Sequence, residues 1–145
     1  MIDSGVKVLK LEAAAMQLLS QSLTSEFYNA VDLLSKCKGK IVLTGMGKSG
    51  HISQKIAATF CSTGSPAQYI HPAEASHGDL GNISRDDVVI ILSNSGETPE
   101  LYNIISFSNK MNLPVVSISG KIKSTLSENS TINLVIPNVK EACPN

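Results

Sequence analysis

The chain has 145 residues, a length that suits one domain with a sizeable hydrophobic core. Its 12 basic and 12 acidic residues give a formal net charge of zero, and aromatic residues make up only 4%. A broad surface for polyanions and stacking platforms for bases are therefore not expected, so no nucleic-acid partner is expected.

The three cysteines are odd in number and widely spaced, at Cys37, Cys61 and Cys143. This pattern disfavours a disulfide framework and a zinc site, and it is typical of a reducing cytosol. Residues 1–5 lack the basic and apolar regions of a secretory signal. No apolar run approaches the roughly 20 residues that cross a bilayer. We expect a cytoplasmic protein without metal or membrane contact.

Residues 6–37 are predicted to be helical. Apolar side chains recur along them at Leu9, Met16, Leu23 and Ala30. The resulting stripe is predicted to pack into the core of the chain, with a dimer face as the alternative. The polar pair Thr24 and Ser25 could divide the region into two helices. Because the stripe is wide, we also expect self-association, as a homodimer or homotetramer.

From Lys40 onward, strands and helices are predicted to alternate. The strands are expected at residues 41–43, 67–70, 88–92, 114–118 and 132–136. A helix is expected at 50–63, and another begins at Pro99 with Thr98 as its N-cap. The continuous apolar run of the third strand indicates burial on both faces of a parallel sheet.

This alternation predicts an α/β fold: a doubly wound, flavodoxin-like sheet of five parallel strands in the order 2-1-3-4-5, flanked by helices. We expect a single domain over residues 1–145, with a helical region at 6–37 and an α/β core at 40–145.

Two glycine- and serine-rich loops follow the first and third strands, GMGKSG at 45–50 and SNSGET at 93–98. Each precedes a helix, where free backbone N–H groups and the helix dipole favour an anion. In doubly wound sheets, ligands bind at the carboxyl ends of the strands where the strand order reverses, here between the first and third strands. The sequence therefore predicts a phosphorylated ligand in one crevice between the loops.

The first loop also matches parts of two nucleotide-binding motifs, but incompletely. Gly45-x-Gly47-x-x-Gly50 fits a dinucleotide fingerprint, but His71 and Pro72 stand where its acidic residue belongs. The run Gly47-Lys48-Ser49 resembles the end of a P-loop, whose first glycine would fall at Val42. The second loop could be an ordinary turn in which the hydroxyls only cap.

Four stretches together resemble the sugar isomerase (SIS) domain: GMGKSGH at 45–51, HPAEASHGDLG at 71–81, SNSGETPE at 93–100 and KEACP at 140–144. More narrowly, they resemble the D-arabinose 5-phosphate isomerases of Kdo and lipopolysaccharide biosynthesis. The resemblance covers roughly residues 5–144. It implies interconversion of D-ribulose 5-phosphate and D-arabinose 5-phosphate through an enediol, with no cofactor and no metal.

By motif match, the catalytic positions of the family fall on Lys48, Glu100 and Glu141. Its substrate- and phosphate-binding positions are expected at Gly47, Ser49, Ser93, Ser95, Thr98 and His77. Aldose–ketose isomerisation needs a carboxylate base and a cation for the developing oxyanion, so either glutamate can be the base and Lys48 can stabilise the oxyanion. Plainer roles remain open: dipole complementation for Glu100, a solvated charge for Glu141 and phosphate binding alone for Lys48.

Members of the family continue after KEACP with a segment that supplies a further histidine, and full-length members carry tandem CBS domains. This sequence ends at Asn145 without either. We therefore expect an incomplete catalytic site, which leaves a second hypothesis open: a module that binds or senses a phosphosugar without converting it.

Overall fold

The computed structural model describes residues 2–143. Within them, five parallel strands form one sheet in the order β2-β1-β3-β4-β5, which confirms the predicted topology. The strands are β1 (Ile41–Gly45), β2 (Ala67–Tyr69), β3 (Val88–Leu92), β4 (Val115–Ser119) and β5 (Ile132–Val135). All residues of β3 are buried, as the apolar run predicts.

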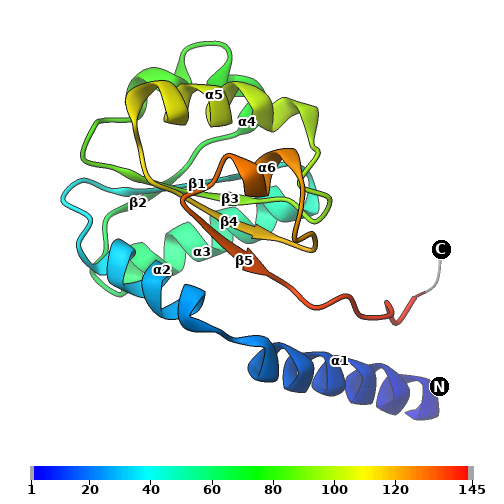
Figure 1. Cartoon of the computed structure of the whole chain (residues 1–145). Helices are drawn as coiled ribbons and strands as arrows, with labels where there is room; N and C mark the ends of the chain where they lie inside the picture. The colour runs from blue at the N-terminus through cyan, green and yellow to red at the C-terminus, as the bar shows by residue number, and fades with distance from the viewer. Residues whose placement is uncertain (1, 144–145) are drawn as a thin grey trace.

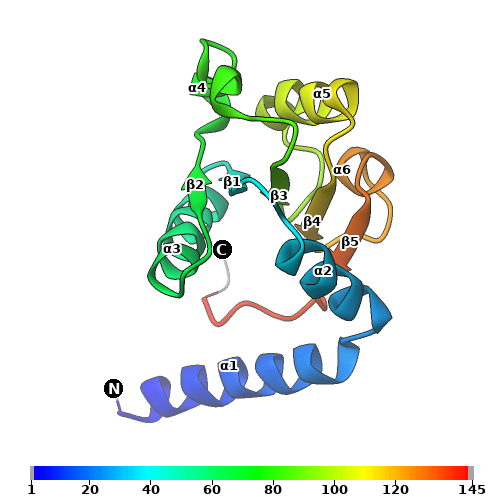
Figure 2. The same ribbon diagram turned by 90° about the vertical axis from the view of Figure 1, so that its left-hand side faces the viewer.

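Helices cover both faces of the sheet (Figures 1 and 2). On one face lie α2 (Ser25–Ser35) and α3 (Lys48–Ser62). On the other lie α4 (Pro72–Ala75), α5 (Tyr102–Met111) and α6 (Thr125–Glu128), with the 3-10 turns η1 (Asp79–Asn82) and η2 (Pro99–Leu101) in the connections. Because side chains alternate along a strand, Val89 and Ile91 pack into one core cluster, and Val88, Ile90 and Leu92 into the other.

The N-terminal helical region divides where Thr24 and Ser25 suggested. Helix α1 (Ile2–Ser22) ends before them, and Thr24 Oγ1 accepts the Glu26 N–H at 3.3 Å to cap α2. The first helix begins at Ile2 rather than at the predicted residue 6.

The predicted core packing of the apolar stripe is wrong for α1. No residue of this helix is buried, and Leu9 and Met16 are 66% and 65% exposed. In Figure 1, most of α1 runs away from the sheet, while Leu19 near its C-terminal end borders an apolar hollow beside Leu134 and Ile136. In α2, by contrast, Ala30 lies against the sheet and is buried.

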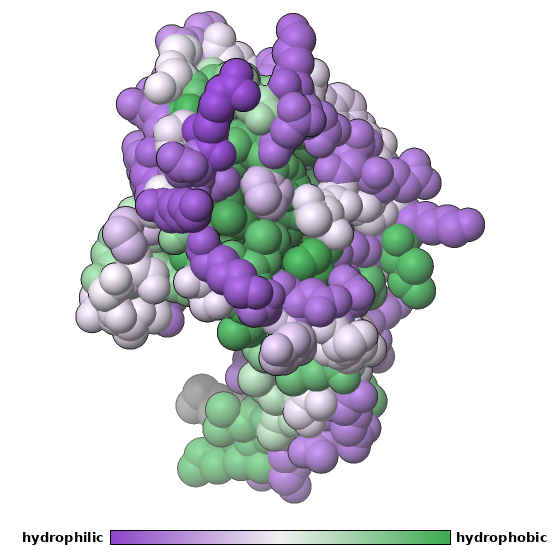
Figure 3. All heavy atoms as spheres, turned by 60° about the vertical axis from the view of Figure 1, so that its left-hand side comes forward, coloured by the Kyte–Doolittle hydropathy of each residue, from purple (hydrophilic) through white to green (hydrophobic). Residues whose placement is uncertain are grey.

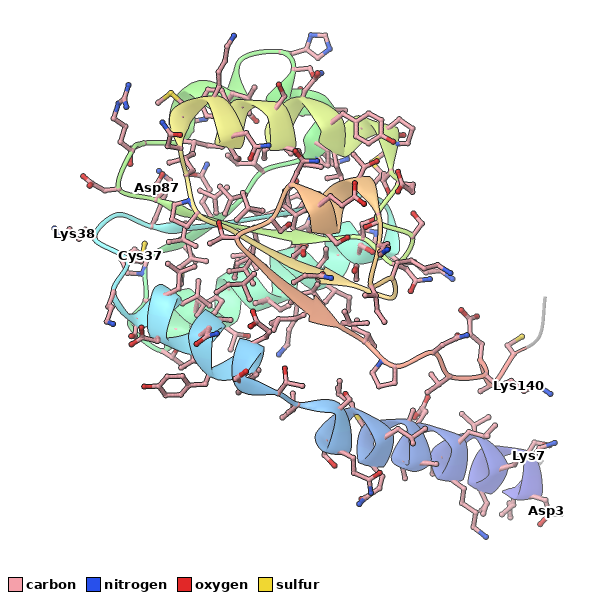
Figure 4. All side chains as sticks on the ribbon, viewed as in Figure 1. Asp3, Lys7, Cys37, Lys38, Asp87 and Lys140 are labelled. Atoms are coloured by element: carbon pink, nitrogen blue, oxygen red, sulfur yellow. The ribbon has the colours of Figure 1, made fainter. Side chains whose placement is uncertain are left out.

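At the amino ends of β1 and β3, a buried carboxylate joins the two strands. Asp87 is 2% exposed and accepts hydrogen bonds from the Lys40 and Ser84 backbone N–H groups at 2.9 and 2.8 Å. Ser84 Oγ at 2.8 Å and Lys40 Nζ at 3.0 Å complete its partners. Figure 4 shows Asp87 near the Cys37–Lys38 turn, where a side chain at Gly39 would collide with the carboxylate.

Within residues 2–143, no helix has the length and hydropathy needed to span a membrane.

Asp87→Asn should lower the free energy of unfolding at pH 7 by about 2–4 kcal/mol, because charge-assisted bonds are lost in a buried site. Burial raises the pKa of Asp87, but the hydrogen bonds from Lys40 and Ser84 lower it by more, so the folded-state pKa lies below its ordinary value. The stabilisation is therefore complete above the unfolded pKa of about 3.9 and is lost as the pH falls through the lower folded value.

Urea unfolding of both proteins between pH 7 and pH 2 measures this effect. Asp32→Asn is the matched control, because it breaks an exposed pair with Lys36 and should cost less than about 0.5 kcal/mol. A difference between wild type and Asp87→Asn that stays constant down to pH 2 would contradict the assignment.

The hydroxyl of Thr44 gives a second test. This side chain of β1 is fully buried, and its Oγ1 has no hydrogen-bond partner among the described residues. Thr44→Val keeps the shape and removes the unpaired group, so it should raise the free energy of unfolding by about 1 kcal/mol. Ser53→Ala should lower it, because Ser53 Oγ donates to Thr44 O at 3.1 Å. A destabilised Thr44→Val protein would show that the hydroxyl makes a bond in solution.

Candidate functional site

The first loop joins β1 to α3 in very close packing. Tyr69 Oη donates to Gly45 O at 3.1 Å, and a Cβ on Gly50 would lie 2.6 Å from that carbonyl oxygen and 2.8 Å from the hydroxyl. Gly47, at the N-cap of α3, has a φ of 57° in the left-handed region. Glycine is therefore required at both positions by the backbone path.

The first turn of α3 offers backbone donors to an anion. Gly50 N–H donates to Met46 O at 3.4 Å and His51 N–H to Gly47 O at 3.1 Å, so the amides of Gly47, Lys48 and Ser49 precede the first helical bonds. Lys48 is exposed at this end of the helix, and Ser49 is half-buried. The N-terminus of α3 thus combines free N–H groups, a hydroxyl and a cation, which suits a phosphate group.

The second loop is organised by hydrogen bonds between its own hydroxyls and amides. Ser93 is buried, and its Oγ lies 2.9 Å from Thr98 Oγ1 and accepts the Gly96 N–H at 3.1 Å. Ser95 is exposed, and its Oγ accepts the Glu97 N–H at 3.2 Å. Whichever of Ser93 and Thr98 donates to the other, one proton of the pair stays free, as does the Ser95 proton. The loop can therefore donate from its hydroxyls to an anion.

The expected position of Thr98 is confirmed, but the expected capping bond is not. Thr98 stands at the N-cap position of η2 with Pro99 directly after it, and its side chain makes no capping hydrogen bond. Its hydroxyl pairs with Ser93 instead, because the segment starts as a 3-10 turn and α5 begins only at Tyr102.

The two loops lie at the same edge of the sheet. Strands β1 and β3 pair in parallel, and Gly45 lies opposite Leu92 at their ends. The two loops therefore start from neighbouring positions at this edge. Glu100 lies in η2 directly after the second loop and is exposed. Helix α4 packs against η2 and α5, and Asn103 Nδ2 donates to Ser76 Oγ at 2.7 Å, which places exposed His77 beside the same region.

Glu141 is placed differently from Lys48 and Glu100. Glu141 lies in the segment 136–143, which follows β5 and forms no helix or strand. Its side chain is exposed. Figure 4 shows its neighbour Lys140 well beyond the end of the sheet. Ion pairs in residues 2–143 join Lys36 to Asp32 and Lys40 to Asp87, and none involves Glu141. In Figures 1 and 2, the segment 136–143 lies apart from η2 at the start of α5, so the structure does not bring the two predicted glutamates together.

Sequence reasoning missed Glu97. Its carboxylate binds Thr125, which lies 28 residues further along the chain, through both the backbone N–H and the hydroxyl at 2.7 Å. A glutamate inside a serine-rich loop is visible in the sequence, but the sequence does not show that its partner is Thr125.

Among residues 2–143, no group of three or more His, Cys, Asp or Glu side chains is arranged to hold a metal ion.

Comparison with known proteins matches residues 33–144 to the family described as SIS domain. An uncharacterised protein of Rickettsia prowazekii is 48% identical over 136 residues, which are 94% of this chain and 43% of that protein. Arabinose 5-phosphate isomerase KdsD of Escherichia coli K12 is 43% identical over 142 residues, with coverage of 98% and 43%. This chain thus spans less than half the length of these curated relatives.

A solved structure of an E. coli CFT073 protein in complex with arabinose 5-phosphate superposes with a TM-score of 0.93. The two chains are 40% identical, and the match covers 98% of this chain and 76% of that one. The matched family covers most of the chain, and the solved relative shares its fold and a large fraction of its residues. The chain therefore belongs to the SIS domain family.

Proposed function

We propose that this chain is a sugar-phosphate isomerase domain that interconverts D-ribulose 5-phosphate and D-arabinose 5-phosphate. The observation that carries the proposal is the placement of two anion-binding loops at neighbouring ends of β1 and β3, with Lys48 in one and Glu100 directly after the other. The similarity to arabinose 5-phosphate isomerases, and to a protein bound to that sugar phosphate, selects the substrate class.

The phosphate group is assigned to the second loop. Ser95 and Thr98 present hydroxyl groups there, and buried Ser93 holds Thr98 in place. Gly47 and Ser49 contribute amide and hydroxyl donors from the start of α3. His77, after α4, is assigned to the wall that contacts the sugar. With the phosphate fixed, the first two carbons of the sugar can reach the charged groups near the ends of the loops.

The reaction moves one proton between C1 and C2. From the aldose, a carboxylate takes the C2 proton, the electron pair forms the C1=C2 bond, and the C1 oxygen takes up a proton to give the enediol. Proton return to C1 and proton loss from the C2 oxygen give the ketose. We assign Glu100 as the base, because it adjoins the phosphate loop, and Lys48 as the cation that stabilises the developing oxyanion. Glu141 would serve only if the segment 136–143 moved toward the loops.

A module that binds a phosphosugar without converting it is the second candidate. The path of the segment 136–143 favours it, because this segment carries Glu141 and lies apart from η2, which carries Glu100. Both candidates share the phosphate site and differ only in whether the C2 proton is exchanged.

Self-association also belongs to the proposal. Helix α1 leaves Leu9, Met16 and Leu18 exposed, and Figure 3 shows apolar side chains on it and at the centre of the body. Between α2, α3 and the sheet lies an apolar hollow of about 420 Å³, which Phe27 and Phe60 help to line. Such surfaces favour a homodimer or homotetramer. We place the protein in the cytosol, where its unpaired cysteines would stay reduced.

The activity is tested by incubating the chain with D-ribulose 5-phosphate in deuterated water and following D-arabinose 5-phosphate by NMR. Glu100→Gln should lower kcat by at least about 10²-fold and leave substrate affinity within a few-fold, because a base acts mainly in the transition state. Glu128→Gln, at an exposed position of α6, is the control and should change neither value.

Two outcomes would overturn these assignments. If turnover survives Glu100→Gln and collapses in Glu141→Gln, the base is Glu141. If the chain binds the sugar phosphate and never exchanges the C2 proton with solvent, the binding module is the correct function.

Light scattering should give at least the mass of a dimer at micromolar concentration. Met16→Glu, which places a charge in the exposed stripe, should lower the average mass. The neighbouring Gln17→Glu adds the same charge beside the stripe and should have a smaller effect. A monomer at every concentration would refute the proposed assembly.

A further inference from the structure

We propose that Glu97 is a positioning residue for the phosphate site: its carboxylate ties the Ser93–Thr98 loop to α6 and thereby fixes the hydroxyls that face the ligand. The proposal rests on the proposed function in one respect, that this loop receives the phosphate group.

Both carboxylate oxygens of Glu97 are engaged by groups outside the loop. Oε1 accepts the Thr125 backbone N–H at 2.7 Å, and Oε2 accepts the Thr125 hydroxyl at 2.7 Å. Tyr102 Oη, on α5, donates to Oε2 at 3.4 Å. Short bonds to a charged acceptor are about twice as strong as neutral ones. One side chain thus links the loop to two helices.

The backbone of the loop lies directly on the segment that contains α6. Leu126 N–H donates to Gly96 O at 3.1 Å, and Gly120 N–H donates to Asn94 O at 3.0 Å. Gly96 has a φ of 68°, and a Cβ there would collide with the Ser124 side chain. The loop can make this contact only with glycine at that position, and Glu97 is the next residue in the chain.

The segment beneath the loop is itself firmly held. Leu126 is fully buried in the core cluster that also contains Ile91 and Leu101. Ser124 and Ser127 form a capping box at the start of α6. Because the Ser93–Thr98 loop is attached to this segment, its position relative to β3 is fixed as well.

The attachment reaches the ligand hydroxyls through the backbone. The N–H of Glu97 donates to Ser95 Oγ at 3.2 Å, and Thr98 follows Glu97 directly. When the carboxylate is bound to Thr125, Glu97 is fixed in place, and the positions of its chain neighbours Ser95 and Thr98 are restricted with it. Without it, Ser95 and Thr98 must be ordered by the ligand, at an entropic cost that weakens binding.

The same contacts answer an electrostatic problem. A free carboxylate in an anion-binding loop would repel the phosphate group. Hydrogen bonds from Thr125 lower the pKa of Glu97 and keep its charge directed at the first turn of α6. The carboxylate is therefore held against Thr125, and the donors of the loop remain available for the ligand.

The test compares Glu97→Ala with Glu97→Gln by calorimetric binding of D-arabinose 5-phosphate and by turnover. Glu97→Ala should raise Kd and KM by about 10-fold with kcat within about 3-fold, because it loosens ground-state positioning. Glu97→Gln should restore affinity to within about 3-fold, since its amide oxygen can accept the Thr125 N–H and its amide nitrogen can donate to Thr125 Oγ1. Glu128→Ala, at an exposed glutamate of α6, should leave both values unchanged.

Thr125→Val completes a double-mutant cycle. It should weaken binding by about 3-fold alone and add nothing to Glu97→Ala, because the two side chains act through one contact. Ser95→Ala serves as the reference for a lost ligand contact and should weaken binding in the presence or absence of the Glu97 carboxylate.

Hydrogen exchange without ligand separates this proposal from the proposed function. In Glu97→Ala, the amides of Thr125 and Leu126 should exchange faster, and Glu97→Gln should restore their protection. If wild type fails to bind the sugar phosphate while this exchange pattern holds, the proposed function fails and the attachment of the loop stands. Wild-type exchange and affinity in Glu97→Ala, or a Glu97→Gln protein as defective as Glu97→Ala, would overturn the proposal.

Discussion

Strands β1 and β3 pair in parallel from Ile41 opposite Val88 to Gly45 opposite Leu92. Every feature of the candidate site depends on this register, since it ends both strands at the same level and points both loops out of one edge. The strand order reverses here, with β2 beside β1 and β4 beside β3, so the two following helices cover opposite faces. Two loops that leave the same edge of the sheet, each leading into a helical segment, result from topology alone, before any side chain is considered.

The polar groups at the two ends of this strand pair differ in whether the protein itself satisfies their hydrogen bonds. At the amino ends, the carboxylate of Asp87 collects four hydrogen bonds and is satisfied entirely by Lys40 and Ser84. At the carboxyl ends, the amides of the α3 turn and the hydroxyls of the second loop keep donors available for a ligand. The buried carboxylate and the proposed binding loops thus lie at opposite edges of the sheet.

The sheet was predictable because its signals are local and periodic. Apolar runs such as Val88–Leu92 fix the strands, and glycine and serine after them mark the loops. The exposure of α1 was not predictable, because an amphipathic pattern does not say whether the rest of the chain supplies a core for it, and in the described part of the chain no residue of α1 is buried. The role of Thr98 depended on a 3-10 turn that delays α5, and the bond of Glu97 to Thr125 depended on a contact 28 residues away. The position of Glu141 follows from the path of a segment without regular structure, which leaves no periodic pattern to read.

The Ser93–Thr98 hydroxyl pair gives the loop an adaptable face. When buried Ser93 donates its proton to Thr98, the half-exposed Thr98 offers its own proton to the ligand; when the bond reverses, Thr98 offers a lone pair instead. A phosphate monoester loses its second proton near pH 6, so it meets the protein near neutrality as a mixture of a doubly charged acceptor and a singly charged species with one P–OH donor. Rotation of two hydroxyls matches either species without moving the backbone. On the proposed function, the loop can therefore hold a phosphate monoester across its second ionisation.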